Sequence, residues 1–394
     1  MPAPSTPDVP STPPTRETDA GAHNVLKHED LFFGTYTERL PHVDGQAPGI
    51  MRASYTGRGQ LGETTLATVL RNPSWVTAFR GVLYAGSETH AEEGQGTVSA
   101  YRINTEQHTL TLLGMRPSGG ADPAHLAISP DGRHLVVANY SGGSVALFGL
   151  QEETGRIGDQ LDLVQHEGTG PNQERQTSPH PHMVAFAPDR AELFVPDLGI
   201  DAVLSYRIED ERLVPAGRID CPAGSGPRHV AFHPSGDLLF VLGELNNQMG
   251  TYRRTDAGFV PVGSIGLLPE SNPEGNLATD IGPDAGEDRT ASTAAAVRVH
   301  SSGSLVFASN RGHDSISVFR HGPGNALSLI ASVPVRGRSP RDIALAPDEQ
   351  YLLSANQDSG SVTVFSVDAQ AEGPGVLSYV GKHRVPTPVC LAWV

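Results

Sequence analysis

The sequence predicts an all-β fold, and within that class a seven-bladed β-propeller. A short strand pattern that ends in a polar dipeptide recurs seven times, at intervals of about 50 residues, which is the length of one propeller blade. The 44 glycines and 32 prolines provide for many tight turns, and no long stretch carries apolar residues at helical spacing. The two ends of the chain also complement each other as the halves of one blade would.

The recurring dipeptide marks the end of the second strand in each unit. The unit is clearest at 123–149, where PAHLAISP reads as a first strand, HLVVANY as a second and SVALFGL as a third, with RIGDQLDLVQH after them as the fourth. Pro-Asp-Gly and Ser-Gly-Gly turns suit the tight connections between these strands. The nearly continuous apolar second strand is typical of a strand covered on both faces. The seven dipeptides are Thr35-Tyr36, Ser87-Glu88, Asn139-Tyr140, Asp197-Leu198, Glu244-Leu245, Asn310-Arg311 and Asn356-Gln357.

Each end of the chain is an incomplete unit. LFFGTYT (31–37) matches a second strand that lacks a first, and PVCLAWV (388–394) matches a first strand with nothing after it. Pairing the two segments would tie the ring shut and protect its edges. Six internal units and this composite unit give seven blades.

Two segments stand apart from the repeat. Residues 1–29 are rich in Pro, Ser and Thr and lack the apolar stretch of a secretory signal, so they are predicted to form a disordered tail. Residues 30–394 are expected to form one propeller domain. Within it, the acidic, Gly- and Pro-rich stretch at about 267–296 is predicted to be a surface insertion, either a loop or a lid over one mouth of the ring.

Composition limits the partners and the location. The chain has 28 Lys and Arg against 44 Asp and Glu, and the net charge of −16 argues against nonspecific binding to nucleic acid or anionic membranes. No run of apolar residues is long enough to span a membrane, and the cytoplasm is the simplest location. Two cysteines, Cys221 and Cys390, do not make a disulfide framework. The sequence leaves the oligomeric state open.

Four residues depart from the repeat and form the candidate catalytic set. Arg228 opens a first strand, Glu244 ends the second strand of the same blade, and Arg311 ends the second strand of the next blade. A Gly-rich loop places His180 just before another first strand. Because inner strands and their connections face the central channel, the four side chains are expected to converge at one mouth. A carboxylate base, a proton-shuttling histidine and two arginines suit the opening of a small anionic lactone.

Four further residues are predicted to bind the substrate. Three of them lie on the same Gly-rich loop as His180, and the fourth begins a first strand as Arg228 does. These residues are Arg175, Gln176, His182 and Arg341.

Structural roles remain as alternatives for several of these residues. Glu244 could pair with Arg228 as a salt bridge, and His182 could belong to the repeated framework together with His229 and His125. Oxygen-bearing side chains at the repeated strand ends also bring calcium or magnesium into consideration. Since propellers repeat polar residues there for structural reasons too, no metal and no cofactor are predicted.

Short motifs in the repeats point to a known family. They are GTYT (34–37), NYSGGSV (139–145), HEGTGP (166–171), RQTSPHPH (175–182), DLGID (197–201), GPRHVAFHP (226–234), GEL (243–245), SNRGHDSI (309–316) and ANQDSGSV (355–362). With these motifs the chain resembles the seven-bladed propeller lactonases, a family that includes propeller-type 6-phosphogluconolactonases and carboxy-cis,cis-muconate cyclase. The similarity covers about Leu31 to Val394.

The resemblance implies a lactone hydrolase whose substrate-handling residues fall on His180, Arg228, Glu244 and Arg311. It implies hydrolysis of a sugar lactone, most specifically of 6-phosphogluconolactone to 6-phosphogluconate in the pentose phosphate pathway. Glu244 would activate water or relay a proton, Arg228 and Arg311 would bind carbonyl and phosphate oxygens, and His180 would orient the substrate or act as an acid. A muconate-type cyclase, a lactonase for another sugar lactone and a non-catalytic binding propeller remain alternatives.

Overall fold

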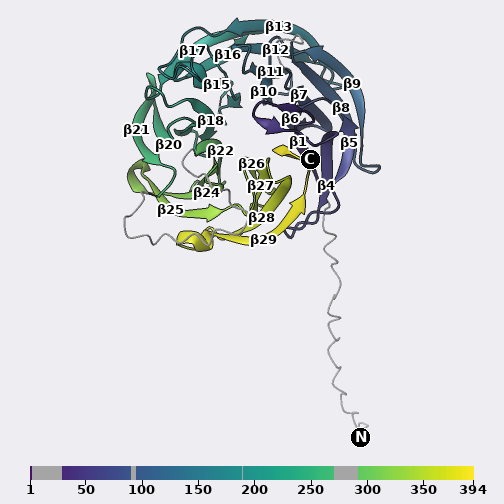
Figure 1. Ribbon diagram of the computed structural model, residues 1–394, viewed down its shortest axis with the longest axis vertical. Helices are drawn as coiled ribbons and strands as arrows, with labels where there is room; N and C mark the ends of the chain where they lie inside the picture. The colour runs from purple at the N-terminus through teal and green to yellow at the C-terminus, as the bar shows by residue number, and fades with distance from the viewer. Residues whose placement is uncertain (2–28, 90–94, 189, 270–291) are drawn as a thin grey trace.

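Seven four-stranded antiparallel sheets surround a common axis in the part of the chain that the structure describes (Figure 1). The structure is a computed structural model, and the residues described are 1, 29–89, 95–188, 190–269 and 292–394. The predicted all-β, seven-bladed propeller is thereby confirmed. The predicted tail, and most of the predicted insertion with its possible role as a lid, lie outside the described residues.

Each blade runs from an inner strand near the axis to a fourth strand at the rim. The inner strands are β6 (Pro73–Phe79), β10 (Pro123–Ile128), β14 (Ala185–Phe186), β18 (Pro227–Phe232), β22 (Thr293–Val299), β26 (Pro340–Leu345) and β30 (Pro388–Trp393). The second strands, in the same order, are β7 (Val82–Ser87), β11 (His134–Asn139), β15 (Glu192–Asp197), β19 (Leu238–Gly243), β23 (Leu305–Arg311), β27 (Tyr351–Asn356) and β1 (Glu29–Thr35).

The outer half of each blade follows the same order. The third strands are β8 (Thr97–Asn104), β12 (Ser144–Leu150), β16 (Ala202–Glu209), β20 (Gln248–Thr255), β24 (Ser315–His321), β28 (Ser361–Val367) and β4 (Gly49–Tyr55). The fourth are β9 (Thr109–Pro117), β13 (Ile157–Gln165), β17 (Arg212–Asp220), β21 (Gly258–Gly266), β25 (Leu327–Pro334), β29 (Leu377–Arg384) and β5 (Thr65–Val69). Outside the blades lie a hairpin of β2 (Arg39–Leu40) and β3 (Val43–Asp44) and the short 3₁₀ turns η2 (Leu198–Ile200), η3 (Pro323–Asn325) and η4 (Gly373–Val376). We number the blades 1 to 6 from β6 to β29, and the closing blade contains β30, β1, β4 and β5.

The core is divided among the interfaces between neighbouring blades. In β11, Leu135 and Val137 pack with residues of blade 1, whereas Val136 and Ala138 pack with residues of blade 3. Successive side chains of a strand point to opposite faces, so a strand between two blades must be apolar on both. This packing explains the continuous apolar second strands of the sequence.

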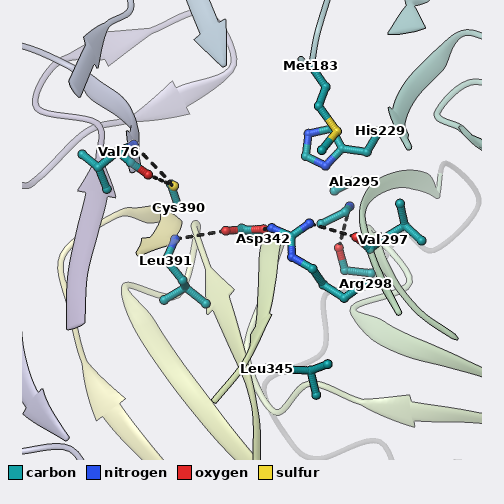
Figure 2. A network of polar contacts seen from close by, with 12 residues as sticks. Val76, Met183, His229, Ala295, Val297, Arg298, Asp342, Leu345, Cys390 and Leu391 are labelled. Carbon is teal, nitrogen blue, oxygen red and sulfur yellow. Dashed lines mark hydrogen bonds and ion pairs between the residues drawn. The ribbon is translucent and has the colours of Figure 1, made fainter. Parts of the chain in front are cut away.

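The closing blade joins both ends of the chain. β30 pairs antiparallel with β1, and the C-terminus lies beside β1 in Figure 1. Figure 2 shows how polar contacts tie β30 to its neighbours: the buried carboxylate of Asp342 accepts hydrogen bonds from Arg298 at 2.7 Å and from the Leu391 amide at 3.0 Å. On the other side, the Cys390 thiol donates to the Val76 carbonyl at 3.4 Å. Blades 5 and 6, the closing blade and blade 1 are therefore joined near the axis.

A bulge near the start of most inner strands aims one side chain out of the regular ladder. In blade 4, Pro227 pairs with Gly243 and His229 with Leu242, so that Arg228 is the extra residue. The same irregularity occurs after the first residue of β6, β10 and β26, where Arg341 is the extra residue of β26. Bulges re-aim side chains and are frequent beside functional sites.

A second ring of positions follows the second strands. Six of the backbone N–H groups there donate to the carbonyl of the residue just before an inner strand or, in blade 3, before Pro181. These donors are Tyr36, Glu88, Tyr140, Leu198, Glu244 and Gln357. Glu244 is thus equivalent to Tyr140, and Gly243, which pairs with Gln248, is equivalent to Asn139. The dipeptide alignment of the sequence was wrong by one residue in blade 4, because Gly243 takes the strand-end position that asparagine holds elsewhere.

Candidate active site

A pocket of about 540 Å³ opens at the mouth of the ring where the second strands end. The bulge positions of the inner strands and the positions that follow the second strands both lie at this mouth. Side chains from all but one of the blades, and from the loop between blades 2 and 3, line it. Those that carry charge or a phenol are Glu88, Tyr140, Arg175, Glu244, Arg311, Arg341 and Asp358, and the histidines His42 and His182 join them.

Glu244 is enclosed by three guanidinium groups. Arg175 Nη2 donates to its Oε1 at 2.9 Å, and Arg311 Nη2 lies 3.1 Å from Oε2. Arg228 Nε lies 3.0 Å from Oε2 as an ion pair and not as an aligned hydrogen bond. Glu244 and Arg228 are almost fully buried, at 3% and 2% exposure. We call these four residues the arginine cage.

The cage is strongly polarised. Burial alone would raise the pKa of Glu244, but Arg311, Arg228 and Arg175 together lower it to about 2. Burial, with the neighbouring charge of Arg311, lowers the pKa of Arg228 to about 9. The carboxylate is therefore ionised at neutral pH, and its three partners outnumber it by two positive charges.

The loop before blade 3 is anchored at its base. Gln176 is fully buried and donates through Nε2 to the Leu198 carbonyl at 2.8 Å and to Asp201 Oδ1 at 2.7 Å. Asp201 also accepts from the Gly226 amide at 2.8 Å, two residues before Arg228. One aspartate thereby positions both the loop that carries Arg175 and the strand that carries Arg228.

The two histidines of the loop occupy different places. His180 stacks on Tyr140 with ring centroids 4.5 Å apart, and its Nδ1 lies 3.0 Å from the Tyr140 carbonyl. His182 is buried, lines the pocket, and packs edge-on against Tyr140 and His229. Its Nδ1 has no hydrogen-bond partner among the described residues. Burial and the charge of Arg228 lower the pKa of His182 well below its usual value, so the imidazole is neutral at pH 7.

The structure brings together most of the residues that the sequence singled out. Glu244, Arg228 and Arg311 meet, and the ion pair between Arg228 and Glu244 that remained as an alternative is present. Arg175, His182 and Arg341 line the same pocket, whereas Gln176 supports the loop from beneath. His180, the remaining member of the candidate catalytic set, is not among the residues that line the pocket and stacks on Tyr140 instead.

The sequence did not single out Tyr140 and Glu88, which line the pocket, or Tyr36, which is buried beside it. Tyr140 accepts from Arg175 Nη2 at 3.1 Å. Across the pocket, Arg341 Nη2 donates to the Tyr36 hydroxyl at 3.0 Å, which in turn donates to Glu88 at 2.8 Å. The signal was present, because Tyr36, Glu88 and Tyr140 are each the second residue of a repeated dipeptide. The second residue of these dipeptides lies toward the pocket, and the first residue does not.

Beneath the pocket, the channel is lined by uncharged rings. His125 packs against Trp75 with ring centroids 3.9 Å apart and ring planes tilted by 31°. Burial lowers the pKa of both His125 and His229 well below the usual value.

Across the described parts of the chain, no group of three or more His, Cys, Asp or Glu is arranged to hold a metal ion. The strand-end amide of Asn356 donates to Thr363 within its own blade, and that of Asn139 donates to Ser144 and to the Ser118 carbonyl in the connection from blade 1.

The comparisons with known proteins agree with this architecture. Residues 30–393 match the family model described as "Lactonase, 7-bladed beta-propeller". A 6-phosphogluconolactonase of Bacillus subtilis is 30% identical over 370 residues, which cover 92% of this chain and 97% of that protein.

Solved structures show the same likeness. The periplasmic gluconolactonase of Pseudomonas aeruginosa superposes with a TM-score of 0.79 at 26% identity, over 93% of this chain and 99% of that one. A putative 6-phosphogluconolactonase of Bacteroides fragilis gives 0.78 at 25% identity, over 95% and 100%. The resemblance that the motifs indicated is confirmed, and with it the prediction of a lactone hydrolase. The chain belongs to the seven-bladed β-propeller lactonase family.

Proposed function

We propose that the protein hydrolyses a sugar lactone in the pocket beside the arginine cage, and most specifically 6-phosphogluconolactone to 6-phosphogluconate. The observation that carries the proposal is the cage itself, three guanidinium groups around one buried carboxylate at the wall of a pocket. Arg175 and Arg311 line the pocket and keep N–H groups that Glu244 does not use. They supply the positive charge that a phosphate and a developing oxyanion both require.

Glu244 is better suited to holding the arginines than to accepting a proton. A carboxylate with a pKa of about 2 is a weak base toward water near neutral pH. Both of its oxygens already face guanidinium groups. We assign Glu244 to fixing three positive charges before the substrate arrives, which avoids reorganisation in the transition state.

We assign the base to His182, because its Nδ1 has no hydrogen-bond partner among the described residues, whereas both oxygens of Glu244 are occupied by guanidinium groups. His182 lies in the pocket wall as a neutral imidazole, and edge-on packing against Tyr140 fixes its ring. Water attacks the lactone carbonyl, its proton passes to His182, and the carbonyl oxygen becomes an oxyanion facing the arginines. The ring C–O bond then breaks, His182 returns the proton to the departing alkoxide, and the new carboxylic acid loses its own proton to solvent. His180 supports Tyr140, and through it Arg175, from behind.

An unphosphorylated sugar lactone is a second candidate. It is favoured by the likeness to the Pseudomonas aeruginosa protein described as a gluconolactonase. The cytoplasmic location and the link to the pentose phosphate pathway stay predictions of the sequence. Because that related protein is described as periplasmic, cell fractionation is the test of location. In the described part of the chain, no helix is long and apolar enough to cross a membrane.

A rate assay on a small lactone panel tests the function. Spontaneous opening is subtracted from the rate with protein for 6-phosphogluconolactone, glucono-δ-lactone and a muconolactone. We expect acceleration of both sugar lactones, with the larger kcat/KM for the phosphorylated one. Arg175→Ala should reduce that preference, whereas the exposed Arg218→Ala should leave it unchanged. The proposal is wrong if no lactone opens faster with the protein than without it.

A further inference from the structure

A second polar cluster lies across the pocket from the arginine cage, and the reaction above does not use it. Tyr36 comes from the closing blade, Glu88 from blade 1 and Arg341 from blade 6, which are three consecutive blades of the ring. The cage and Tyr140 come from blades 2, 4 and 5 and the loop before blade 3. Because both groups border one pocket at the same mouth, they face each other across it.

The cluster is rigidly built around a buried phenol. Tyr36 is 0% exposed; its hydroxyl accepts from Arg341 at 3.0 Å and lies 2.8 Å from both carboxylate oxygens of Glu88. The Arg341 guanidinium sits over the Tyr36 ring, 5.4 Å from its centroid, and His42 packs edge-on against the same ring. Burial raises the pKa of Tyr36 well above its usual value, so the phenol keeps its proton and remains a donor to Glu88.

Hydrogen-bonding capacity remains on both sides of this phenol. Among the described residues, Arg341 commits one of its five N–H donors, to Tyr36. Glu88 accepts only from Tyr36 there, although two carboxylate oxygens offer about four acceptor sites. The cluster therefore presents donors and acceptors side by side with no net charge, whereas the cage carries an excess of two positive charges.

Because the cluster and the cage differ in net charge, they should bind different chemical groups of a ligand. An anion at the cluster would meet Arg341 but would be repelled by Glu88. An apolar group would leave a guanidinium and a carboxylate unpaired as water leaves, and unpaired buried charges are costly. A pair of adjacent hydroxyl groups fits, because each hydroxyl can donate to Glu88 and accept from Arg341.

We propose that Tyr36, Glu88 and Arg341 form a subsite for the adjacent hydroxyl groups of a polyhydroxylated ligand, opposite an arginine cage that takes its anionic or carbonyl oxygens. The proposal rests on the proposed function in taking the ligand to be a sugar lactone or its open acid. It adds to that function by assigning the binding of the hydroxyl groups to one side of the pocket. Selectivity for hydroxylated over plain lactones then comes from Glu88 and Arg341, and selectivity for phosphate comes from the cage.

Equilibrium binding tests the subsite without requiring turnover. Calorimetric titration of the full chain with gluconate and with hexanoate compares acids with and without hydroxyl groups. We expect the wild type to bind gluconate at least about tenfold more tightly, because hexanoate leaves the buried donors and acceptors of the subsite without partners. Glu88→Gln and Tyr36→Phe should each remove most of this preference while hexanoate binding stays unchanged. The exposed Glu209→Gln serves as the matched control and should keep the wild-type ratio.

The outcomes separate the subsite from the catalytic proposal. Equal weakening of both acids in Glu88→Gln, or a wild type with no preference for gluconate, would overturn the subsite. Tyr36→Phe keeps the ring that packs beneath Arg341, so a correctly folded Tyr36→Phe protein with an unchanged ratio would overturn it as well. A protein that prefers gluconate but accelerates no lactone would disprove the catalytic function and leave the subsite standing. The reverse result would disprove the subsite alone.

Discussion

At the scale of single residues, the site is defined by the charge that surrounds Glu244. Its carboxylate is buried, and yet it stays ionised because three arginines outweigh the cost of burial. Removing one partner of a buried ion pair leaves the other charge uncompensated, which is strongly destabilising. The cage should therefore contribute to stability in a way that depends on pH.

Glu244→Gln should lower stability at neutral pH and much less in acid. The folded pKa of about 2 lies below the ordinary value of 4.5, so the stabilisation is present above pH 4.5 and is lost as the pH falls toward 2. By proton linkage, the lowered pKa of Glu244 contributes roughly 3 kcal/mol to the free energy of unfolding at pH 7 and about 1 kcal/mol at pH 3. Urea unfolding of the wild type and the variant at both pH values measures the difference. A stability gap that does not narrow in acid would contradict the ionised cage.

The pH profile of the reaction should reflect His182. Because burial and the neighbouring arginines lower its pKa well below 6.5, the imidazole remains available as a base in mildly acidic solution. We expect kcat/KM for glucono-δ-lactone to stay level as the pH falls through 6.5, after correction for spontaneous opening. His182→Asn should lower kcat by about 10²-fold or more with little change in KM. A wild-type profile that halves near pH 6.5 would argue against His182.

At the scale of elements, the strands could be predicted from the sequence, whereas the positions of the site residues depend on how the strands pair. Second and third strands were recognisable because burial on both faces makes them apolar throughout. The bulge that makes Arg228 the extra residue of β18 depends on the register of pairing with β19. The local sequence does not predict this register. For the same reason Glu244 was taken for the end of the second strand, although Gly243 holds that position.

The partners of Glu244 show the same limit. Arg228 and Arg311 were predictable because they interrupt a repeated pattern. Arg175 lies on an irregular loop 69 residues away from Glu244, and only the closed ring brings the two together. Tyr36 and Arg341 are separated by 305 residues, yet they are neighbours because the closing blade packs against blade 6.

The loop before blade 3 should act on the reaction through Arg175. Gln176 holds this loop against Asp201 and Leu198 without reaching the pocket. Gln176→Ala should therefore lower kcat/KM by about tenfold, mostly through KM, by releasing the arginine from its place. The double variant with Arg175→Ala should be little worse than Arg175→Ala alone, with a coupling energy of about 1 kcal/mol. Steady-state kinetics on the four proteins of the cycle gives this energy. Additive losses would mean that Gln176 acts independently of Arg175.

At the scale of the whole molecule, the pocket exists only while the ring is closed. Its two walls belong to blades far apart in sequence, and the closing blade lies between blades 6 and 1. A seventh blade made from both ends converts what would be two open edges into paired strands. Asp342 and Cys390 add polar contacts on each side of β30.

Deleting residues 388–394 should prevent folding, whereas relocating the chain ends should not. The deletion removes β30, exposes the hydrogen-bonding edge of β1 and uncovers apolar residues such as Phe32, which packs with Cys390. A circular permutant can join Val394 to Glu29 through a short glycine linker, because the Val394 amide lies 3.1 Å from the Asp30 carbonyl. Its new ends would open the β10–β11 turn at Asp131, on the surface. We expect a cooperative thermal transition near that of the wild type for the permutant, and aggregation or no transition for the deletion, by circular dichroism and light scattering. A deletion variant that melts cooperatively as a monomer would show that the ring does not need its composite blade.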